Sequence, residues 1–328
     1  MVRVSAGTAA VLGLRRYRLL VPPTTAYLMV GEGCRYSCAF CPQAQASAGR
    51  RDRLSRVVWP PAAKEEVVLA VREAARAGKI KRVCLQVVHS RGIWAPVLDM
   101  VTALAACGLP VCVSCSPATL RRIGQLLEVG ADGVTIPLDA ACCRVYRAVK
   151  SGSWQRRWQL LEGAAVRFPG RIGTHLIVGL GETEREMLEC LQRLHDQGVR
   201  VGLFAFTPVR GTPLAQTPPP PVGTYRRIQA GWFLIRTGAC SYADMRFAPD
   251  GRVVDYGLAS QQLEELLKTG EAFRTTGCPD CNRPYYNERP GGVVYNYPRP
   301  LTEAEARECI LQMEECGEED GDALALDR

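Results

Sequence analysis

The sequence predicts an α/β fold built on a mainly parallel sheet. Short β-branched runs alternate with longer segments of helical periodicity from about residue 25 to residue 215, which is the pattern of consecutive βα units. Glycine follows several helical segments where a helix C-cap is expected, as at Gly78, Gly108 and Gly130. A chain of 328 residues is long enough for one large domain with an extension.

Six strands and five intervening helices make up the expected domain. Each strand is a short apolar run, and each helix repeats apolar residues every three to four positions. The expected strands are Thr25–Val30, Arg82–Val88, Pro110–Cys115, Gly133–Pro137, Ile172–Val178 and Gly202–Thr207. The expected helices are Ala63–Ala77, Trp94–Ala106, Ala118–Val129, Ser153–Phe168 and Glu184–Gln197, followed by a helix at Tyr225–Thr237 and a strand near Asp244–Ala248.

The C-terminal part has a different composition. Residues 270–300 are rich in Gly, Pro, Asn, Tyr and Arg with little periodicity, which predicts an ordered loop held by something other than a hydrophobic core. Thr302 and Glu305 form a capping box that opens a final helix to about Cys316. We expect an N-terminal segment over 1–24, the α/β domain over 25–250, an extension over 251–317 and a disordered acidic tail over 318–328.

Charge and cysteine content narrow the class of protein. The net charge of +8 is spread along the chain, and no basic stripe interleaved with aromatic residues predicts nucleic-acid binding. No apolar run approaches the roughly 20 residues of a membrane span, so a cytoplasmic protein that does not bind membranes is expected. Fifteen cysteines, an odd number, favour metal ligation over a disulfide framework.

Cys34, Cys38 and Cys41 follow the first expected strand in a CxxxCxxC spacing. Three thiolates on one short loop can hold three irons of a cubane cluster, which leaves the fourth iron without a protein ligand. A zinc site is the alternative, but it would require a fourth ligand nearby. The spacing, and the aromatic Phe40 before the last cysteine, favour the cluster.

With this loop the sequence resembles the radical S-adenosylmethionine (SAM) superfamily over roughly residues 25–250. The resemblance implies an incomplete (βα)6 radical SAM barrel with a C-terminal cluster-binding extension, and a 4Fe-4S cluster whose open iron chelates SAM. In that family an electron from the cluster cleaves SAM reductively, and the resulting deoxyadenosyl radical abstracts a hydrogen atom from the substrate.

Within the superfamily the chain resembles the biotin synthase and lipoyl synthase branch. The run from Ile177 to Thr183 matches the branch's fifth-strand motif beside the adenine, and the run from Arg210 to Leu214 matches its motif after the sixth strand. Asp139 falls where the branch contacts the ribose, and Arg157 where it contacts the SAM carboxylate. The resemblance assigns SAM contacts to Phe40, Asp139, Arg157, Ile177, Gly179, Gly181, Glu182 and Thr207.

Biotin synthase holds a second, sulfur-donating cluster inside its barrel on three cysteines and an arginine. Cys84, Cys112 and Arg246 fit three of those positions, but Gly173 stands near the position of the fifth-strand cysteine. Because one thiolate is missing, the resemblance does not support a cluster of the biotin synthase type. An alternative remains open for Cys84 and Cys112, which could be small core residues.

Cys278 and Cys281 form a CxxC in the loop of low regular content, and such a loop requires a metal to order it. A zinc knuckle is one interpretation. A second iron–sulfur cluster is the other, because this tail resembles the two-protein lipoyl synthase system of archaea and some bacteria. The expected cluster lies over the barrel mouth at the carboxyl ends of the strands, with Cys115 as a candidate further ligand.

That resemblance implies insertion of sulfur into an octanoyl chain on a lipoyl-carrier protein. The implied partners are that octanoylated carrier, a homologous radical SAM protein and a reductant protein. Two alternatives stay open, namely a biotin-synthase-like or other radical SAM reaction on a free small molecule, and a non-catalytic iron–sulfur carrier or assembly protein.

Overall fold

A computed structural model describes residues 1–288 and 291–314, and it is organised around one eight-stranded sheet. The strands follow the order β10-β9-β8-β7-β6-β2-β1-β5, and the six from β10 to β2 are parallel. These six are β2 (Thr25–Val30), β6 (Arg82–Val87), β7 (Val111–Ser114), β8 (Gly133–Thr135), β9 (Ile172–Val178) and β10 (Arg200–Ala205). The predicted α/β fold with a parallel sheet is confirmed.

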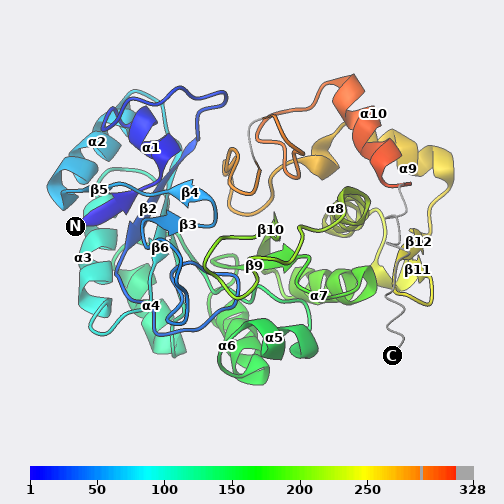
Figure 1. Cartoon of the computed structure of the whole chain (residues 1–328), viewed down its shortest axis with the longest axis horizontal. Helices are drawn as coiled ribbons and strands as arrows, with labels where there is room; N and C mark the ends of the chain where they lie inside the picture. The colour runs from blue at the N-terminus through cyan, green and yellow to red at the C-terminus, as the bar shows by residue number, and fades with distance from the viewer. Residues whose placement is uncertain (289–290, 315–328) are drawn as a thin grey trace, which may run out of the picture.

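Helices cover the outer face of the curved sheet (Figure 1). They are α2 (Lys64–Arg76), α3 (Trp94–Ala105), α4 (Leu120–Glu128), α5 (Cys143–Val149), α6 (Trp154–Arg167) and α7 (Glu184–Asp196). Alternate strand residues such as Val83 and Leu85 are fully buried in the core that these helices share with the sheet. Because successive residues of a strand point to opposite faces, the residues between them are free to line the inside of the sheet.

The N-terminal residues add elements that the sequence pattern does not predict. Strand β1 (Val2–Val4) pairs antiparallel with both β2 and β5 (Pro61–Ala62), and α1 (Ala6–Val11) follows it. Strands of two or three residues carry too little of the period-two pattern to be recognised. Residues 1–24 therefore extend the sheet beyond β2.

The remaining elements follow β10 or lie in the loop after β2. They are the hairpin β3 (Arg53–Leu54) and β4 (Val57–Val58), helix α8 (Val222–Thr237), the hairpin β11 (Arg246–Phe247) and β12 (Val253–Asp255), helices α9 (Ser260–Leu267) and α10 (Glu303–Gln312), and short 3-10 turns at Tyr242–Asp244 and Glu271–Phe273. The capping box at Thr302 opens α10 as predicted. Helix α10 ends at Gln312, before the expected end near Cys316, and the expected tail 318–328 lies outside the described residues.

The segment between the 3-10 turn at Glu271–Phe273 and α10, described over 274–288 and 291–302, is called the C-terminal loop. Coloured orange in Figure 1, it runs across the open side of the sheet between β10 and β2. On the β10 side the backbone N–H of Leu203 donates to Thr276 Oγ1 at 3.1 Å. On the β2 side the backbone N–H of Arg283 donates to Tyr27 Oη at 2.9 Å. Polar contacts at both edges thus hold the loop against the inner face of the partial barrel.

Helix α8 fastens the later part of this loop. The buried Arg226 guanidinium donates to the carbonyl oxygens of Val294 and Tyr295, at 2.5 and 2.7 Å. Gln229, one turn later, donates to the same Tyr295 oxygen at 3.0 Å. Side chains of α8 thus donate hydrogen bonds to loop carbonyl oxygens that lie outside any helix or strand. The predicted ordered loop is therefore held largely by hydrogen bonds.

Candidate active site

One cavity lies on the inner face of the sheet, between the six parallel strands and two loops. The loops are the cysteine loop after β2 and the C-terminal loop. The strand residues that face it recur every second position. They include Tyr27 and Met29 of β2, Cys84 and Gln86 of β6, Cys112 and Ser114 of β7, Thr135 of β8, Gly173, His175 and Ile177 of β9, and Arg200, Gly202 and Phe204 of β10.

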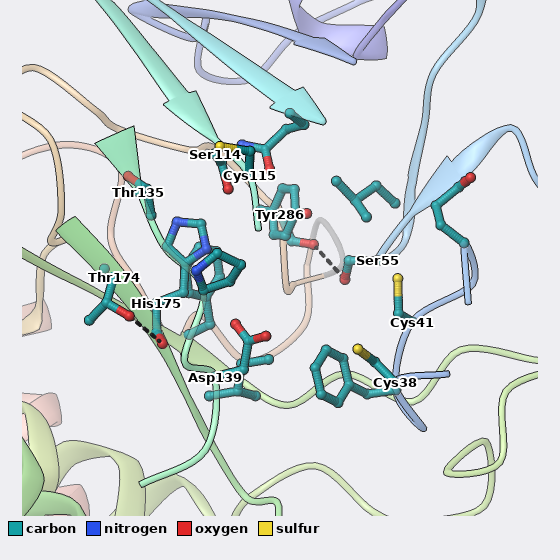
Figure 2. Close-up of a pocket in the computed structure, with 18 of the residues that line it drawn as sticks. Cys38, Cys41, Ser55, Ser114, Cys115, Thr135, Asp139, Thr174, His175 and Tyr286 are labelled. Carbon is teal, nitrogen blue, oxygen red and sulfur yellow. Dashed lines mark hydrogen bonds between the residues drawn. The ribbon is translucent and has the colours of Figure 1, made fainter. Parts of the chain in front are cut away.

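Cys34, Cys38 and Cys41 all line this cavity, on the loop that leaves the carboxyl end of β2. The backbone N–H of Cys41 donates to the Cys38 carbonyl at 3.1 Å, which forms a turn, and Figure 2 shows both side chains beside the pocket. Burial raises the pKa of both thiols, that of Cys41 to about 12. A metal that binds here must displace their protons. The donor set therefore fits the cluster that the spacing predicts.

Arg157, predicted to contact the SAM carboxylate, lines the same cavity. Its Nη1 atom is buried and has no hydrogen-bond partner within the described part of the chain. A buried guanidinium nitrogen without a partner is costly, and an anionic ligand would relieve that cost. Phe40, Ile177 and Thr207 also lie on the cavity wall. The structure places these four predicted residues on the wall of the cavity that the cysteine loop also lines, and their contacts with SAM stay a prediction.

Asp139 reaches the cavity too, but in a buried ion pair that the sequence analysis did not predict. Lys150 Nζ lies 2.5 Å from Asp139 Oδ2 and also donates to the Pro137 carbonyl at 3.0 Å. Burial raises the pKa of Cys38, while the Lys150 charge opposes that rise. Asp139 has a φ of 67°, in the left-handed region where asparagine and aspartate are enriched. A lysine eleven positions away gives no local sequence signal.

Three other predicted SAM residues build a turn after β9. The Glu182 carboxylate accepts the backbone N–H groups of Gly179 and Leu180, at 2.7 and 3.1 Å. Burial raises its pKa to about 7. Gly179 and Gly181 have φ values of 98° and 109°, which favour glycine. The described lining of the cavity does not include Gly179, Gly181 or Glu182, so their contact with the adenine also stays a prediction.

Cys278 and Cys281 line the cavity together with Cys84 and Cys112. Cys278 Sγ lies 3.4 Å from Cys112 Sγ. The contact with Cys112, aided by the charges of nearby arginines, lowers the pKa of the Cys278 thiol to about 6. Cys281 Sγ lies 3.3 Å from Tyr27 Oη.

The CxxC loop sits at the amino ends of the strands. Arg82, the first residue of β6, donates through Nε to the carbonyl oxygen of Pro279 at 3.1 Å. Thr24, just before β2, donates its backbone N–H to Asn282 Oδ1 at 3.0 Å. The expectation that this loop lies over the carboxyl-end mouth is wrong, because Thr24 and Arg82 bind the loop at the amino ends of β2 and β6.

Arg246 does not take the place expected from biotin synthase. It lies on the β11–β12 hairpin, its side chain is 78% exposed, and it pairs with Asp255. Arg283 and Arg200 line the cavity instead. Gly173, which stands near the position of the fifth-strand cysteine of biotin synthase, lines the cavity. Cys115 lies on the same wall and is buried, which raises its pKa to about 12.

Several residues that line the cavity were not predicted from the sequence. For Tyr27, Gln86 and His175, the period-two pattern around recognised strands was an available signal. Lys150, Arg283 and Tyr286 come from loops or helix ends, where no period exists. Figure 2 shows Tyr286 of the C-terminal loop among strand residues such as Thr135 and His175.

Across 1–288 and 291–314, no three His, Cys, Asp or Glu side chains are grouped as ligands of a metal ion. An iron–sulfur cluster makes a different demand, because its cysteines bind different iron atoms. In the same ranges no helix has the length and apolar character needed to cross a membrane.

Proteins named biotin synthase are among those similar to this chain. The chain is 27% identical over 276 residues to the biotin synthase of Synechococcus sp. (strain CC9311), covering 81% of this chain and 80% of that protein. It is 32% identical over 198 residues to the biotin synthase of Methylobacterium radiotolerans, covering 57% of this chain and 56% of that protein. The second match thus spans little more than half of the relative's length.

Among solved structures, the FeFe-hydrogenase maturase HydG from Carboxydothermus hydrogenoformans superposes with a TM-score of 0.51 at 17% identity, covering 65% of this chain and 51% of that chain. A second HydG structure gives a TM-score of 0.53 at 14% identity, with 65% and 50% coverage. At such identities the likeness concerns the fold alone. The sequence profile described as "Radical SAM superfamily" matches residues 28–194, which is half of the chain. This protein therefore belongs to the radical SAM superfamily.

Proposed function

We propose that this protein is a sulfur-inserting radical SAM enzyme of the lipoyl synthase type, acting on an octanoyl chain carried by a lipoyl-carrier protein. The observation that carries the proposal is one cavity with two groups of cysteines. Cys34, Cys38 and Cys41 lie at the carboxyl ends of the strands, and Cys278 and Cys281 lie toward the amino ends. A substrate between them would face both groups.

The residues at the carboxyl end fit the binding of a 4Fe-4S cluster and SAM. The three cysteines would each hold one iron, and the cluster with SAM supplies the radical that takes a hydrogen atom from the substrate. Arg157 offers its buried Nη1 to the SAM carboxylate. Lys150 holds Asp139 at the cavity wall. Phe40 and Ile177 add apolar walls that keep water from the reacting groups.

Sulfur insertion requires a sulfur atom close to the carbon that has lost its hydrogen. The second cluster, held by Cys278 and Cys281, would supply that sulfur within a near-attack distance of roughly 3–3.5 Å. Each insertion would move one hydrogen atom from carbon into deoxyadenosine, with methionine as the other product of SAM, and would form a carbon–sulfur bond to a cluster sulfide while one cluster iron takes up the remaining electron. The cluster is consumed in this scheme, so repeated turnover requires that it be rebuilt.

The octanoyl substrate is supported by the cavity and by the tail. Met29, Leu54, Trp59 and Phe204 give the cavity apolar surface that suits an acyl chain. The net charge of +8 suits an acidic carrier protein. A homologous radical SAM protein and a protein reductant complete the proposed set of partners, by the resemblance of the CxxC tail to the two-protein system.

A biotin-synthase-like reaction on a free small molecule is the second candidate. The relatives that are named biotin synthase favour it, as does the position of Cys84 and Cys112 inside the barrel. The glycine at position 173 and the exposed Arg246 depart from the biotin synthase ligand set. A third candidate, a non-catalytic iron–sulfur carrier, would not cleave SAM.

One experiment separates the three candidates. The anaerobically reconstituted protein is incubated with SAM and dithionite, with either an octanoylated carrier protein or dethiobiotin, and with or without a homologous partner. Sulfur gained by the carrier-bound chain, measured by mass spectrometry together with deoxyadenosine, supports the proposal. Sulfur gained only by the free compound favours the second candidate. No deoxyadenosine under strong reductant favours the carrier.

A further inference from the structure

Four cysteines converge in the amino-terminal half of the cavity, and we call them the barrel tetrad: Cys84, Cys112, Cys278 and Cys281. Cys84 and Cys112 are register partners on β6 and β7, and neighbouring strands lie about 4.8 Å apart. Cys278 Sγ lies 3.4 Å from Cys112 Sγ. Strand cysteines and loop cysteines, far apart in the chain, thus face one space.

Cys281 is placed next to the strand cysteines by its contact with Tyr27. Tyr27 is the register partner of Cys84 on the neighbouring strand β2. Its Oη lies 3.3 Å from Cys281 Sγ and accepts the backbone N–H of Arg283 at 2.9 Å. The loop cysteines therefore flank the two strand cysteines, with Cys278 beside Cys112 and Cys281 on the side of Cys84.

Polar groups contact three of the four sulfurs. Gln86 Nε2 donates to Cys84 Sγ at 3.0 Å, and Thr135 Oγ1 lies 3.3 Å from Cys112 Sγ. Tyr27 Oη makes the corresponding contact with Cys281 Sγ, at 3.3 Å. A buried thiol that only fills space packs among apolar groups. Hydrogen bonds to ligand sulfurs orient them and tune the potential of a cluster, so this surrounding suits ligands better than core residues.

Arginines surround the tetrad with positive charge. Arg82, which is 5% exposed, donates to the Pro279 carbonyl inside the CxxC turn. Arg283 donates through Nη2 to the Thr276 carbonyl at 2.6 Å. Arg200 lines the cavity, and its buried Nε has no hydrogen-bond partner in the described ranges. A cluster held by four thiolates is an anion, so these charges stabilise it.

We propose that the barrel tetrad is the complete protein ligand set of the second iron–sulfur cluster, with two ligands from the sheet and two from the C-terminal loop. This ligand set differs from the three cysteines and one arginine considered in the sequence analysis, because the loop supplies two thiolates that the strands lack. The role of the cluster as sulfur source rests on the proposed function. The ligand set itself is measurable without turnover.

The tetrad also explains how the CxxC segment is fixed. A cluster bound to all four cysteines links β6 and β7 to the loop that bridges β10 and β2, across the open side of the partial barrel. Cys115 is not part of this set. It lies beyond the end of β7, where the neighbouring charge that acts on its thiol is Arg157.

The test starts from the Cys34→Ala/Cys38→Ala/Cys41→Ala variant, which should retain only the second cluster. Each tetrad cysteine is then changed to alanine, one at a time. Cys190→Ala, at a buried site on α7, and Cys115→Ala are the matched controls. After anaerobic reconstitution, iron, sulfide and zinc per chain are measured with absorption and Mössbauer spectra. We expect about four irons in the starting variant, at least a roughly fivefold loss in each tetrad variant, and no loss in the controls.

Several results would overturn the assignment. An unchanged iron content in both Cys84→Ala and Cys112→Ala would show that the strand cysteines are not ligands. A loss of iron in Cys115→Ala would show that Cys115 is a ligand instead. Stoichiometric zinc with little iron would establish a zinc site, and a Cys112–Cys278 disulfide in the reconstituted protein would establish a redox pair. Circular dichroism checks folding, and serine variants, which can keep a weaker oxygen ligand, should shift the spectra. If four irons bind but no substrate gains sulfur, the ligand set stands and the proposed function fails.

Discussion

Cys112 and Cys278 lie 166 positions apart in the chain, yet their Sγ atoms are 3.4 Å apart inside the barrel. The contact joins a central strand to a loop that has no place in the sheet. It brings the cysteines of the C-terminal loop and those of strands β6 and β7 into one site.

The cysteine loop at the carboxyl ends should be indispensable for SAM cleavage. Cys38→Ala leaves two thiolates for the cubane, so we expect deoxyadenosine formation to fall to background. The measurement is deoxyadenosine by chromatography after incubation with SAM and dithionite, with Cys190→Ala as control. Normal SAM cleavage by Cys38→Ala, with iron retained elsewhere, would contradict the catalytic assignment.

Arg157→Ala should weaken SAM binding while leaving both clusters in place. The variant removes a charge-assisted contact, which typically contributes about 1.5–3 kcal/mol, so the Kd for SAM should rise about ten- to a hundredfold. Equilibrium binding with the reconstituted, unreduced protein gives the Kd, and iron analysis gives the control. An unchanged Kd would show that the buried Nη1 serves another group.

Lys150→Met should destabilise the fold, because it leaves the Asp139 carboxylate buried without its partner. Removal of one member of a buried pair costs about 3–5 kcal/mol in the free energy of unfolding. The double variant Lys150→Met/Asp139→Asn should recover much of that loss. Denaturant unfolding of the three proteins provides the comparison, and equal stability of single and double variants would argue against the coupling.

Removal of the metal should loosen the C-terminal loop. The loop has few core contacts of its own, so a cluster on the tetrad should restrain it strongly. We expect backbone amides of residues 276–287 to exchange with deuterium roughly tenfold faster or more after chelation of iron. Segments of α2 and α3 serve as internal controls. Equal exchange with and without metal would mean that hydrogen bonds alone hold the loop.

His175 should make stability depend on acid pH. Burial at the cavity wall lowers its pKa to about 4, while the unfolded chain keeps a value near 6.5. Below about pH 6.5, His175 binds a proton in the unfolded state but stays neutral in the folded state. The free energy of unfolding therefore falls as the pH drops toward about 4. Denaturant unfolding measures the free energy of unfolding of the wild type and of His175→Gln at about pH 7.5 and about pH 5. Between these two pH values, we expect that free energy to fall less in the variant than in the wild type. Equal decreases would place the titration elsewhere.

The sequence by itself determined the scaffold and the carboxyl-end site. Strands β2 and β9 begin and end at the predicted residues, because long apolar runs carry their periodicity locally. The spacing of Cys34, Cys38 and Cys41 predicts cluster ligands because a cluster on one short loop needs a fixed local spacing, and that ligation stays a prediction. Short elements such as β1 and α5 were missed, since they contain too few residues for a pattern to show.

Only the tertiary structure decided which distant residues meet. The pairing of Lys150 with Asp139 and the contact of Cys278 with Cys112 depend on how helix ends and the C-terminal loop pack against the sheet. The loop was expected at the carboxyl-end mouth, whereas its bonds to Arg82 and Tyr27 hold it against the amino-terminal half. Local sequence cannot encode that choice, because it is set by hydrogen-bonding partners on strands that lie 197 and 256 residues away in the chain.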